Sequence, residues 1–335
     1  MAAGELEGEL RKAGMISSDS ARLSPIAGGV SSDIFLVEDG DRRFVVKQAL
    51  DQLRVKDEWL ADRSRNRTEQ DYFAYVAGIL PGVVPQIIYA DPDQGWFAME
   101  YLAGEWRNWK TDLLAGQADP AVARRVGDTL GRLHRASWGD PAARSRFATL
   151  KNFTDLRISP YLLSTAERVP DLRRLLRAEA QRLGATELAL VHGDYSPKNL
   201  LIAPGRLMIL DAEVAWFGDP TFDVAFLLNH FHLKALYHAS RPASDAMLGL
   251  AAEAWKAYAA ALGPRDADLE ARSVHLMLCL MLARVHGKSP VEYLTAPGQG
   301  GIVSEFVHRH LPRSPTTFSA LGAAWREAIQ PRRSS

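Results

Sequence analysis

Three polar side chains in the middle of the chain are of the kind that binds a hard divalent cation. Asp194 and Asn199 stand five residues apart, and Asp211 follows further along the chain. Oxygen ligands without histidine or cysteine suit magnesium. Magnesium sites built from one or two carboxylates usually take their remaining ligands from substrate phosphates. The three residues therefore indicate nucleotide chemistry at a Mg²⁺ site.

Two short apolar runs separate Asn199 from Asp211 and predict a β-hairpin. Residues 200–203 and 207–210 are the expected strands, and the turn signal between them contains Gly205. If the hairpin is centred on Gly205, Asn199 and Asp211 face each other at its open end. Their Cβ atoms would then lie roughly 4.5–5.5 Å apart, close enough to share one cation.

The segment also resembles the catalytic motifs of kinase-fold phosphotransferases, in which a loop Asp is followed by an Asn and by a second Asp at a strand end. His192–Gly193–Asp194, rather than a His-Arg-Asp form, is similar to the aminoglycoside phosphotransferase and choline kinase branch. Asp211–Ala212–Glu213 and Phe222–Asp223 also resemble the methylthioribose kinases. An ordinary hairpin with an Asx-rich turn explains any one of these residues, but not their order and spacing together.

The resemblance implies an α+β, protein-kinase-like bilobal fold. It places a nucleotide-binding lobe with an antiparallel sheet at residues 1–102 and a mostly helical catalytic and substrate-binding lobe at residues 103–335. The implied activity is ATP-dependent transfer of the γ-phosphate to a hydroxyl group of a small molecule. A nucleotide-binding pseudokinase or regulatory module without turnover is the alternative, although all the catalytic positions are filled.

The resemblance also assigns roles to the residues of the central motif. Asp194 is the expected catalytic base, and Asn199 and Asp211 are the expected Mg²⁺ ligands. Glu213 would lie on the same strand face as Asp211 if the strand continues, and it is a candidate ligand for a second ion. Lys198 is a candidate for neutralising charge on the transferred group, but the sequence is equally compatible with a surface lysine that has no such role.

Further motif positions are expected to hold ATP. The sequence between residues 26 and 33 is rich in glycine and serine, and such a loop can place N–H and hydroxyl groups against phosphates. The candidates in it are Gly28, Gly29, Ser31 and Ser32.

Lys47 ends the next expected strand, where the kinase fold keeps its phosphate-binding lysine. Glu69 is the expected partner of Lys47, with Glu58 as the alternative. Glu100 and Leu102 resemble the hinge, whose main-chain groups bind the adenine edge.

Apolar periodicity and turn signals locate the elements that must position these residues. Strands are expected over 34–37, 44–47, 83–90 and 96–101. Helices are expected over 52–80, in two pieces, and over 122–136, 222–236, 246–261 and 269–286. The charges of the Arg-rich segment 150–183 are expected on a solvated face. His134 is expected to be a hydrogen-bonded core histidine, and Asp223 to brace the catalytic loop through its main-chain amides, as in the family.

Composition limits the classes of partner and compartment. The chain has 335 residues, with 40 Lys and Arg against 40 Asp and Glu, which gives no reason to expect a nucleic acid or a membrane as a partner. Cys279 is the only cysteine, so no disulfide can form within the chain. Together with the absence of an apolar signal segment near residue 1, this favours a cytoplasmic location. The oligomeric state is left open.

The acceptor of the phosphoryl group is not fixed by these motifs, since they handle ATP. The helical region after Leu102 has no concentrated acidic stretch and is rich in arginine, which disfavours a polycationic acceptor.

Overall fold

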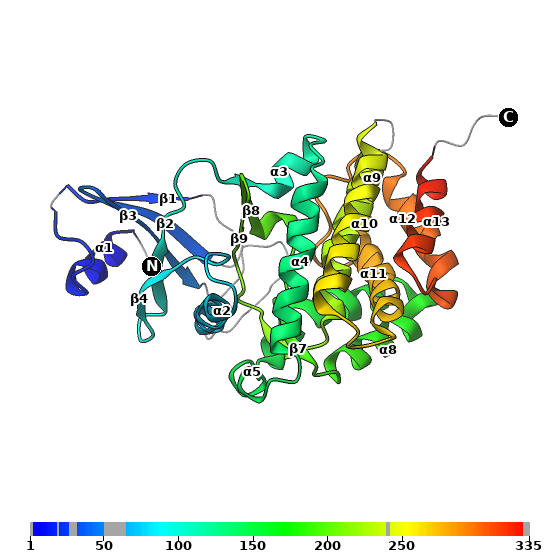
Figure 1. Cartoon of the computed structure of the whole chain (residues 1–335), viewed down its shortest axis with the longest axis horizontal. Coiled ribbons are helices and arrows are strands. Elements are labelled where there is room, and N and C mark those ends of the chain that lie inside the picture. Colours follow the sequence, from blue (N-terminus) through cyan, green and yellow to red (C-terminus); the bar gives the residue numbers. More distant parts are fainter. Residues whose placement is uncertain (1–2, 19, 27–31, 50–64, 239–241, 331–335) are drawn as a thin grey trace. The chain divides into compact units, whose positions relative to one another are not determined.

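The chain divides into two compact units, residues 1–105 and 106–335. The computed structural model describes residues 3–18, 20–26, 32–49, 65–238 and 242–330. Figure 1 labels the elements in chain order. Within these ranges, no helix is long and apolar enough to cross a membrane.

The first unit is built on an antiparallel sheet of five strands in the order β1-β2-β3-β5-β4. Its elements are α1 Ala3–Lys12, β1 Arg22–Pro25, β2 Ser32–Asp39, β3 Arg42–Ala49, α2 Arg65–Ile79, β4 Ile87–Asp91 and β5 Trp96–Glu100. The strand expected over 83–90 begins only at Ile87, because Gly82 has a φ of 82° and Pro85 cannot donate to a sheet. Of the helix expected over 52–80, the second piece is α2, and the first piece lies outside the described residues.

The second unit is mainly helical. Its helices are α3 Trp109–Leu114, α4 Pro120–Ser137, α5 Pro141–Arg146, α6 Leu150–Phe153, a π-helix Thr154–Leu163, α7 Ser164–Arg168, α8 Arg173–Gly184, α9 Thr221–Tyr237, α10 Ala243–Leu262, α11 Leu269–His286, α12 Gln299–His310 and α13 Phe318–Ile329. Its short strands are β6 Arg107–Asn108, β7 Ala189–Val191, β8 Leu200–Ala203, β9 Arg206–Ile209 and β10 Trp216–Gly218. An antiparallel-sheet unit followed by a helical unit confirms the predicted α+β class.

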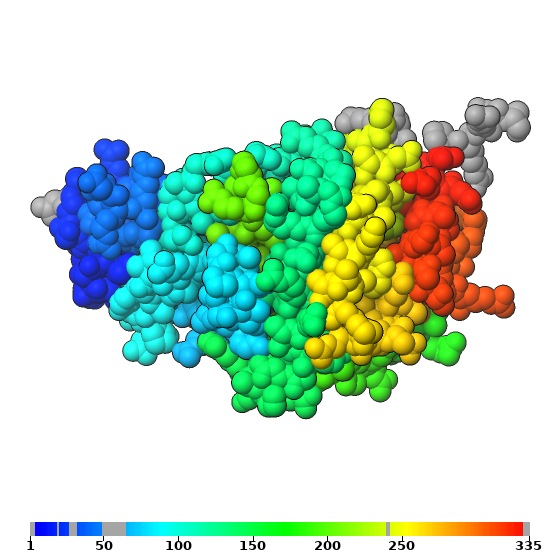
Figure 2. Space-filling view, viewed as in Figure 1, coloured from blue at the N-terminus to red at the C-terminus, as the bar shows by residue number. Residues whose placement is uncertain are grey.

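Helices α4 and α10 pack closely because two glycines on α4 face the main chain of α10. A Cβ on Gly127 would lie 2.1 Å from the Ala254 carbonyl oxygen, and one on Gly131 would lie 2.5 Å from that of Tyr258. Asp119 caps α4 by accepting from the Ala121 N–H at 2.8 Å. Figures 1 and 2 show α10 lying between α4 and α13 on one face of this unit.

Helix α9 is the central helix of the second unit. Its sixteen residues from Thr221 to Leu236 are all buried, and they include Asp223, His230 and Lys234 as well as apolar side chains. A helix that is apolar on every side is typically buried in this way. The polar side chains of α9 therefore must find partners inside the protein. Cys279 on α11 is also buried.

Candidate active site

The loop after β7 is shaped by a glycine that has to approach another segment. Gly193 has a φ of 77°, and a Cβ at this position would lie 2.7 Å from the Val214 carbonyl oxygen. His192 fixes the loop on either side: its Nε2 is 3.1 Å from the Leu210 carbonyl oxygen, and its Nδ1 is 3.1 Å from the Asp194 amide nitrogen, which donates to it. Burial lowers the pKa of His192, in keeping with a neutral ring.

Asp223, in the first turn of α9, holds the loop from behind. Its two carboxylate oxygens accept from the His192 N–H at 2.7 Å and the Gly193 N–H at 2.9 Å. His134 Nε2 lies 3.3 Å from Asp223 Oδ2, and His134 Nδ1 lies 3.0 Å from the Tyr258 hydroxyl. Both expectations are confirmed: Asp223 braces the loop through its amides, and His134 is a satisfied core histidine.

The loop presents Asp194, a buried carboxylate held by two cations. Lys198 Nζ and an Arg157 guanidinium nitrogen each lie 2.9 Å from Asp194 Oδ2, and the Ser196 hydroxyl donates to Oδ1 at 3.3 Å. Burial raises the pKa of Asp194, but Lys198 and Arg157 outweigh this effect and hold it below its usual value. Asp194 is therefore an ionised acceptor of hydrogen bonds at neutral pH.

Arg157 is the residue of the candidate site that the sequence interpretation missed. Its side chain is buried, and besides Asp194 it donates to the Gly193 and Leu156 carbonyl oxygens. The expectation of a solvated face is therefore wrong for this residue. One signal was available, because Arg157 stands between the apolar residues Leu156 and Ile158, which are both buried.

Asn199 lies beside the loop, but the expected register is wrong by one residue. Leu200 pairs with Ile209, and the Leu210 N–H donates to the Asn199 carbonyl oxygen at 2.9 Å, so Leu210 rather than Asp211 is opposite Asn199. The reason is that the turn has two residues, Pro204 and Gly205, whereas centring on Gly205 requires three. The Asn199 amide Nδ2 donates to the Asp194 carbonyl oxygen at 3.0 Å.

Asp211 and Glu213 follow the hairpin in irregular backbone. Asp211 has a φ of 62°, and the Ala215 N–H donates to the Ala212 carbonyl oxygen at 3.1 Å, which forms a turn. The argument that placed Glu213 on the strand face of Asp211 is therefore wrong. Burial lowers the pKa of Arg157, but Asp194, with Glu213 and Asp211 adding to it, raises this pKa above its usual value. Glu213 and Asp211 are therefore near enough to Arg157 to act on its charge.

These oxygen donors fit a magnesium ion better than a transition metal. The Asn199 amide directs its nitrogen to the loop, and no described donor contacts its Oδ1. Asp211 raises the pKa of Asp194 by like-charge repulsion, which a bound cation would relieve. In the described ranges, no three His, Cys, Asp or Glu side chains form a metal site by themselves, so phosphate oxygens would have to complete the ligand shell.

In the first unit, Lys47 on β3 and Glu69 on α2 form the expected pair. Lys47 Nζ lies 2.7 Å from Glu69 Oε2, and both side chains are at most 4% exposed. The alternative partner Glu58 is outside the described residues. So are Gly28, Gly29 and Ser31 of the expected phosphate-binding loop.

Ser32, Glu100 and Leu102 are the other expected nucleotide contacts of this unit. Ser32 begins β2, and its buried hydroxyl has no hydrogen-bond partner among the described residues. The Glu100 N–H donates to the Gln86 carbonyl oxygen at 2.9 Å, and the Glu100 side chain accepts from the Gln86 N–H at 2.9 Å. Leu102 follows β5, and its N–H meets no acceptor in the described ranges.

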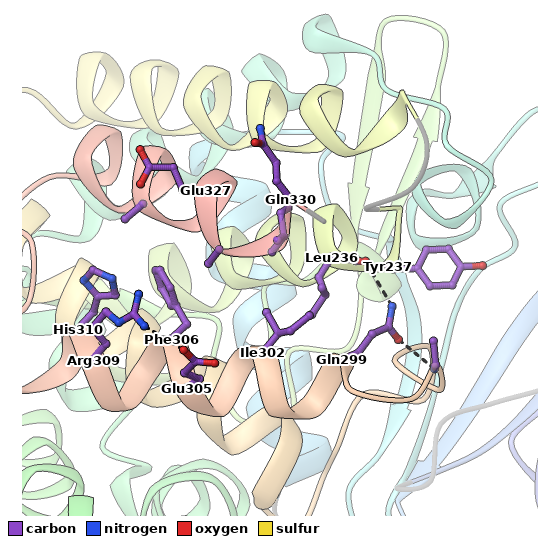
Figure 3. A pocket seen from close by; sticks show the side chains of 14 residues that line it. Leu236, Tyr237, Gln299, Ile302, Glu305, Phe306, Arg309, His310, Glu327 and Gln330 are labelled. Atoms are coloured by element: carbon purple, nitrogen blue, oxygen red, sulfur yellow. Dashed lines mark hydrogen bonds and ion pairs between the residues drawn. The ribbon is translucent and has the colours of Figure 1, made fainter. Parts of the chain in front are cut away.

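A separate cavity lies in the second unit between the carboxyl end of α9 and helices α12 and α13 (Figure 3). It has a volume of about 840 Å³, and Gln299 Nε2 donates across its edge to the Leu236 carbonyl oxygen at 3.3 Å. Ile302 and Glu327 face it from α12 and α13. None of its lining residues belongs to the Asp194 loop or to the β8–β9 hairpin, so we do not assign it to the candidate active site.

Comparison with known proteins identifies the family of the chain. The model of the family described as the phosphotransferase enzyme family matches residues 22–264, which include Lys47, Asp194 and Asp211. A methylthioribose kinase of Pectobacterium atrosepticum is 27% identical over 244 residues, 63% of this chain and 61% of that protein. One of Yersinia pseudotuberculosis is 24% identical over 254 residues, 67% of this chain and 62% of the relative. The chain thus spans about three fifths of the length of these relatives.

Solved structures show the same fold. A choline/ethanolamine kinase family protein of Mesorhizobium loti superposes with a TM-score of 0.54 at 19% identity, covering 98% of this chain and 100% of the other. An amicoumacin kinase in complex with AMP-PNP, Ca²⁺ and Ami superposes with a TM-score of 0.58 at 15% identity, covering 95% and 99%. The predicted kinase-like fold is confirmed.

Proposed function

The chain belongs to the phosphotransferase enzyme family, and from this premise we propose that it transfers the γ-phosphate of ATP to a hydroxyl group of a small molecule. The observation that carries the proposal is the buried Asp194 carboxylate, held by Arg157 and Lys198 in a loop that Asp223 braces. The relatives named methylthioribose kinase and the amicoumacin kinase bound to AMP-PNP support the same class of reaction.

Asp194 is the residue that we assign to the acceptor hydroxyl. Its carboxylate accepts a hydrogen bond from the hydroxyl group and so orients the oxygen toward the γ-phosphorus. As the new O–P bond forms and the bond to the β–γ bridging oxygen breaks, the hydroxyl proton passes to Asp194. Phosphoryl transfer has a loose transition state, so placement of the oxygen matters more than strong basicity. A carboxylate whose pKa is lowered by Lys198 and Arg157 suits that role.

Cationic side chains supply the rest of the electrostatics. We assign Lys47, held by Glu69, to the inner phosphates of ATP, and Lys198 to the charge that develops on the transferred group. Asn199 and Asp211 would hold Mg²⁺, with Glu213 beside them. When bound, Mg²⁺ neutralises negative charge on the phosphate oxygens. Gly28, Gly29, Ser31 and Ser32 are assigned to the triphosphate, and the main chain of Glu100 and Leu102 to the adenine edge.

The substitution Asp194→Asn tests the proposal. With an acceptor found by screening hydroxyl compounds for ATP consumption, we expect the variant to lose roughly 10²–10⁴-fold or more in kcat, because the oriented acceptor and the proton acceptor are removed together. ATP affinity, measured by titration, should change little. Asp128→Asn is the matched control, because Asp128 is half exposed and forms only a 3.8 Å pair with Arg132.

Two outcomes would contradict this assignment. Substantial turnover by Asp194→Asn removes Asp194 from its role. ATP binding without turnover of any acceptor by the wild-type protein favours a nucleotide-binding module instead.

A further inference from the structure

Four basic side chains of the second unit, three of them buried, are not used by the proposed mechanism. They come from α3, α9 and α11, and we refer to Lys110, His230, Lys234 and Arg284 as the basic cluster. Burial lowers the pKa of His230 far below its usual value, and Lys234, Arg284, Lys198 and Lys110 lower it further by their positive charge. The positive charges of Lys110, Lys234 and Arg284 therefore all act on His230.

A series of contacts connects the basic cluster to the Asp194 loop. Arg157, which pairs with Asp194, lies 5.9 Å from the centre of the Tyr161 ring. The Tyr161 hydroxyl accepts from an Arg284 guanidinium nitrogen at 3.2 Å. Arg157 also lies 6.0 Å from the centre of the Phe226 ring, which contacts the His230 ring with centres 5.4 Å apart. The cluster is therefore connected through Arg157 and two aromatic rings to Asp194, the carboxylate that we assign to the acceptor hydroxyl.

Two of these cations are buried without an anionic partner. The Lys234 side chain is 1% exposed; its ammonium lies 4.6 Å from the centre of the Tyr293 ring and meets no hydrogen-bond acceptor in the described part of the chain. Arg284 is 8% exposed, donates to neutral oxygens of Tyr161 and Ser289, and keeps a buried Nε without a partner there. Neither cation has a carboxylate within ion-pair distance among the described residues.

Neutral donors around these cations are also unsatisfied. The His230 ring Nδ1 and the Tyr293 hydroxyl are both buried, and neither has a hydrogen-bond partner among the residues that the structure describes. Buried polar groups are rarely left unpaired in proteins, because each costs free energy and a buried unpaired charge costs far more. Several such groups side by side indicate a position that a ligand fills.

The charge of the missing ligand group follows from these donors. The one carboxylate at the edge of the basic cluster, Glu292, is 61% exposed and already pairs with Lys110. Burial, with Lys110 and Arg284 adding to it, lowers the pKa of Lys234 to about 7 although Glu292 acts in the opposite direction, and a bound anion would oppose that shift further. The cluster can thus accept negative charge and repels positive charge.

We propose that the basic cluster binds an anionic group of the acceptor, so that the substrate is a hydroxyl compound carrying a carboxylate or a phosphate. This inference rests on the proposed kinase function and names its substrate class. Lys234 and Arg284 pair with the oxyanion, His230 and Tyr293 complete its hydrogen bonds, and the hydroxyl group of the same molecule reaches Asp194. Cationic acceptors are excluded by repulsion from the same residues.

Matched pairs of compounds test the proposal. ADP release is measured with D-gluconate against D-glucose and with D-ribose 5-phosphate against D-ribose, and with choline as a cation. Equilibrium affinities for the same compounds are measured by calorimetry. We expect an anionic member to bind at least 10-fold more tightly than its neutral counterpart. The comparison with gluconate tests a carboxylate as the anionic group, and the comparison with ribose 5-phosphate tests a phosphate.

The variant Lys234→Met keeps the length of the side chain and removes its charge. We expect it to raise the KM and the Kd for the preferred anionic compound about 10- to 100-fold, as loss of a charged hydrogen bond does, with a smaller change in kcat. The Kd for ATP and for the neutral counterpart should stay the same. Lys110→Met, at a 32% exposed side chain, should give a smaller effect in the same direction. Lys256→Met, on an exposed part of α10, is the control for charge alone.

Three results would overturn the proposal while leaving the proposed function intact. They are tighter binding of neutral or cationic compounds than of the anionic ones, an unchanged anion affinity in Lys234→Met, or an equal loss of ATP affinity in that variant, which would assign the cluster to the nucleotide. If no compound is turned over but the anions bind through Lys234, the basic cluster is an anion site and its assignment to the acceptor fails.

Discussion

Substitution of Asp223 tests whether this residue stabilises the Asp194 loop through hydrogen bonds or only interacts favourably with the dipole of α9. Asp223 is fully buried and accepts two main-chain N–H groups of the Asp194 loop at 2.7 and 2.9 Å. A carboxylate in the first turn of any helix gains only about 0.3–1 kcal/mol from the dipole. If the hydrogen bonds matter as the geometry indicates, removing them has to cost far more than that.

The magnitude follows from the bonds that each variant loses. Hydrogen bonds to a charged group contribute about 1.5–3 kcal/mol each, so loss of the two main-chain bonds alone in Asp223→Ala should lower the free energy of unfolding by roughly 3–6 kcal/mol. Asp223→Asn keeps one acceptor oxygen and turns an NH₂ group toward the other main-chain N–H, so we expect a loss of roughly 2–4 kcal/mol. Because the loop is released, kcat should fall by more than about 10²-fold in both variants.

Asp245 provides a matched control. Like Asp223, it is the third residue of its helix, but it is 76% exposed, and its only polar side-chain partner among the described residues is Arg326, at 2.8 Å. Asp245→Asn should therefore cost at most about 1 kcal/mol and leave kcat unchanged. Urea denaturation at pH 7 and initial rates of ADP release measure both quantities. Equal losses in Asp223→Asn and Asp245→Asn, or wild-type kcat in Asp223→Asn, would refute the brace.

Three further predictions follow from the other buried charges. Arg157→Met removes one of the two cations that lower the pKa of Asp194, so the acidic limb of the kcat/KM profile should move to higher pH; an unmoved limb would contradict the pairing. Glu69→Gln removes the carboxylate that pairs with the buried Lys47 and should lower the free energy of unfolding by about 3–5 kcal/mol, measured by thermal denaturation. The same variant should raise the KM for ATP, measured from initial rates. Lys234 has a pKa of about 7 in the folded chain and an ordinary value when unfolded. The free energy of unfolding of the wild type should therefore rise relative to that of Lys234→Met between pH 7 and 9, by on the order of 3 kcal/mol. Parallel curves of unfolding free energy against pH for the two proteins would exclude a buried charge.

Local signals were enough to find the segments of the site, but not its register. The strand over residues 200–203 was predicted to the residue, because apolar runs and a Pro-Gly turn are local properties. The prediction that Asn199 and Asp211 face each other was wrong, because one residue more or less in the turn shifts every cross-strand partner. A turn formed by Pro204 and Gly205 was as compatible with the sequence as a longer one.

Contacts between distant segments were predicted only where the family resemblance supplied them. The resemblance named Lys47 with Glu69, and Asp223 with the loop amides, and both contacts are present. Arg157 lies 37 residues before Asp194, in a segment with many other arginines, and no local pattern marks which of them turns inward. Its apolar neighbours were the only signal, and they become informative once the π-helix is known to be buried.

The balance of buried charge connects the catalytic residue to the choice of substrate. Asp194 pairs with two cations, Arg157 and Lys198, whereas Lys234 and Arg284 have no carboxylate within ion-pair distance in the described chain. A fold selected only for stability would replace a buried unpaired lysine by an apolar side chain. Lys234→Met should therefore gain stability below pH 7 and lose anion affinity at the same time. A gain in stability with no loss of affinity would mean that Lys234 only packs against Tyr293, and the positive charge beside Asp194 would then need a different explanation.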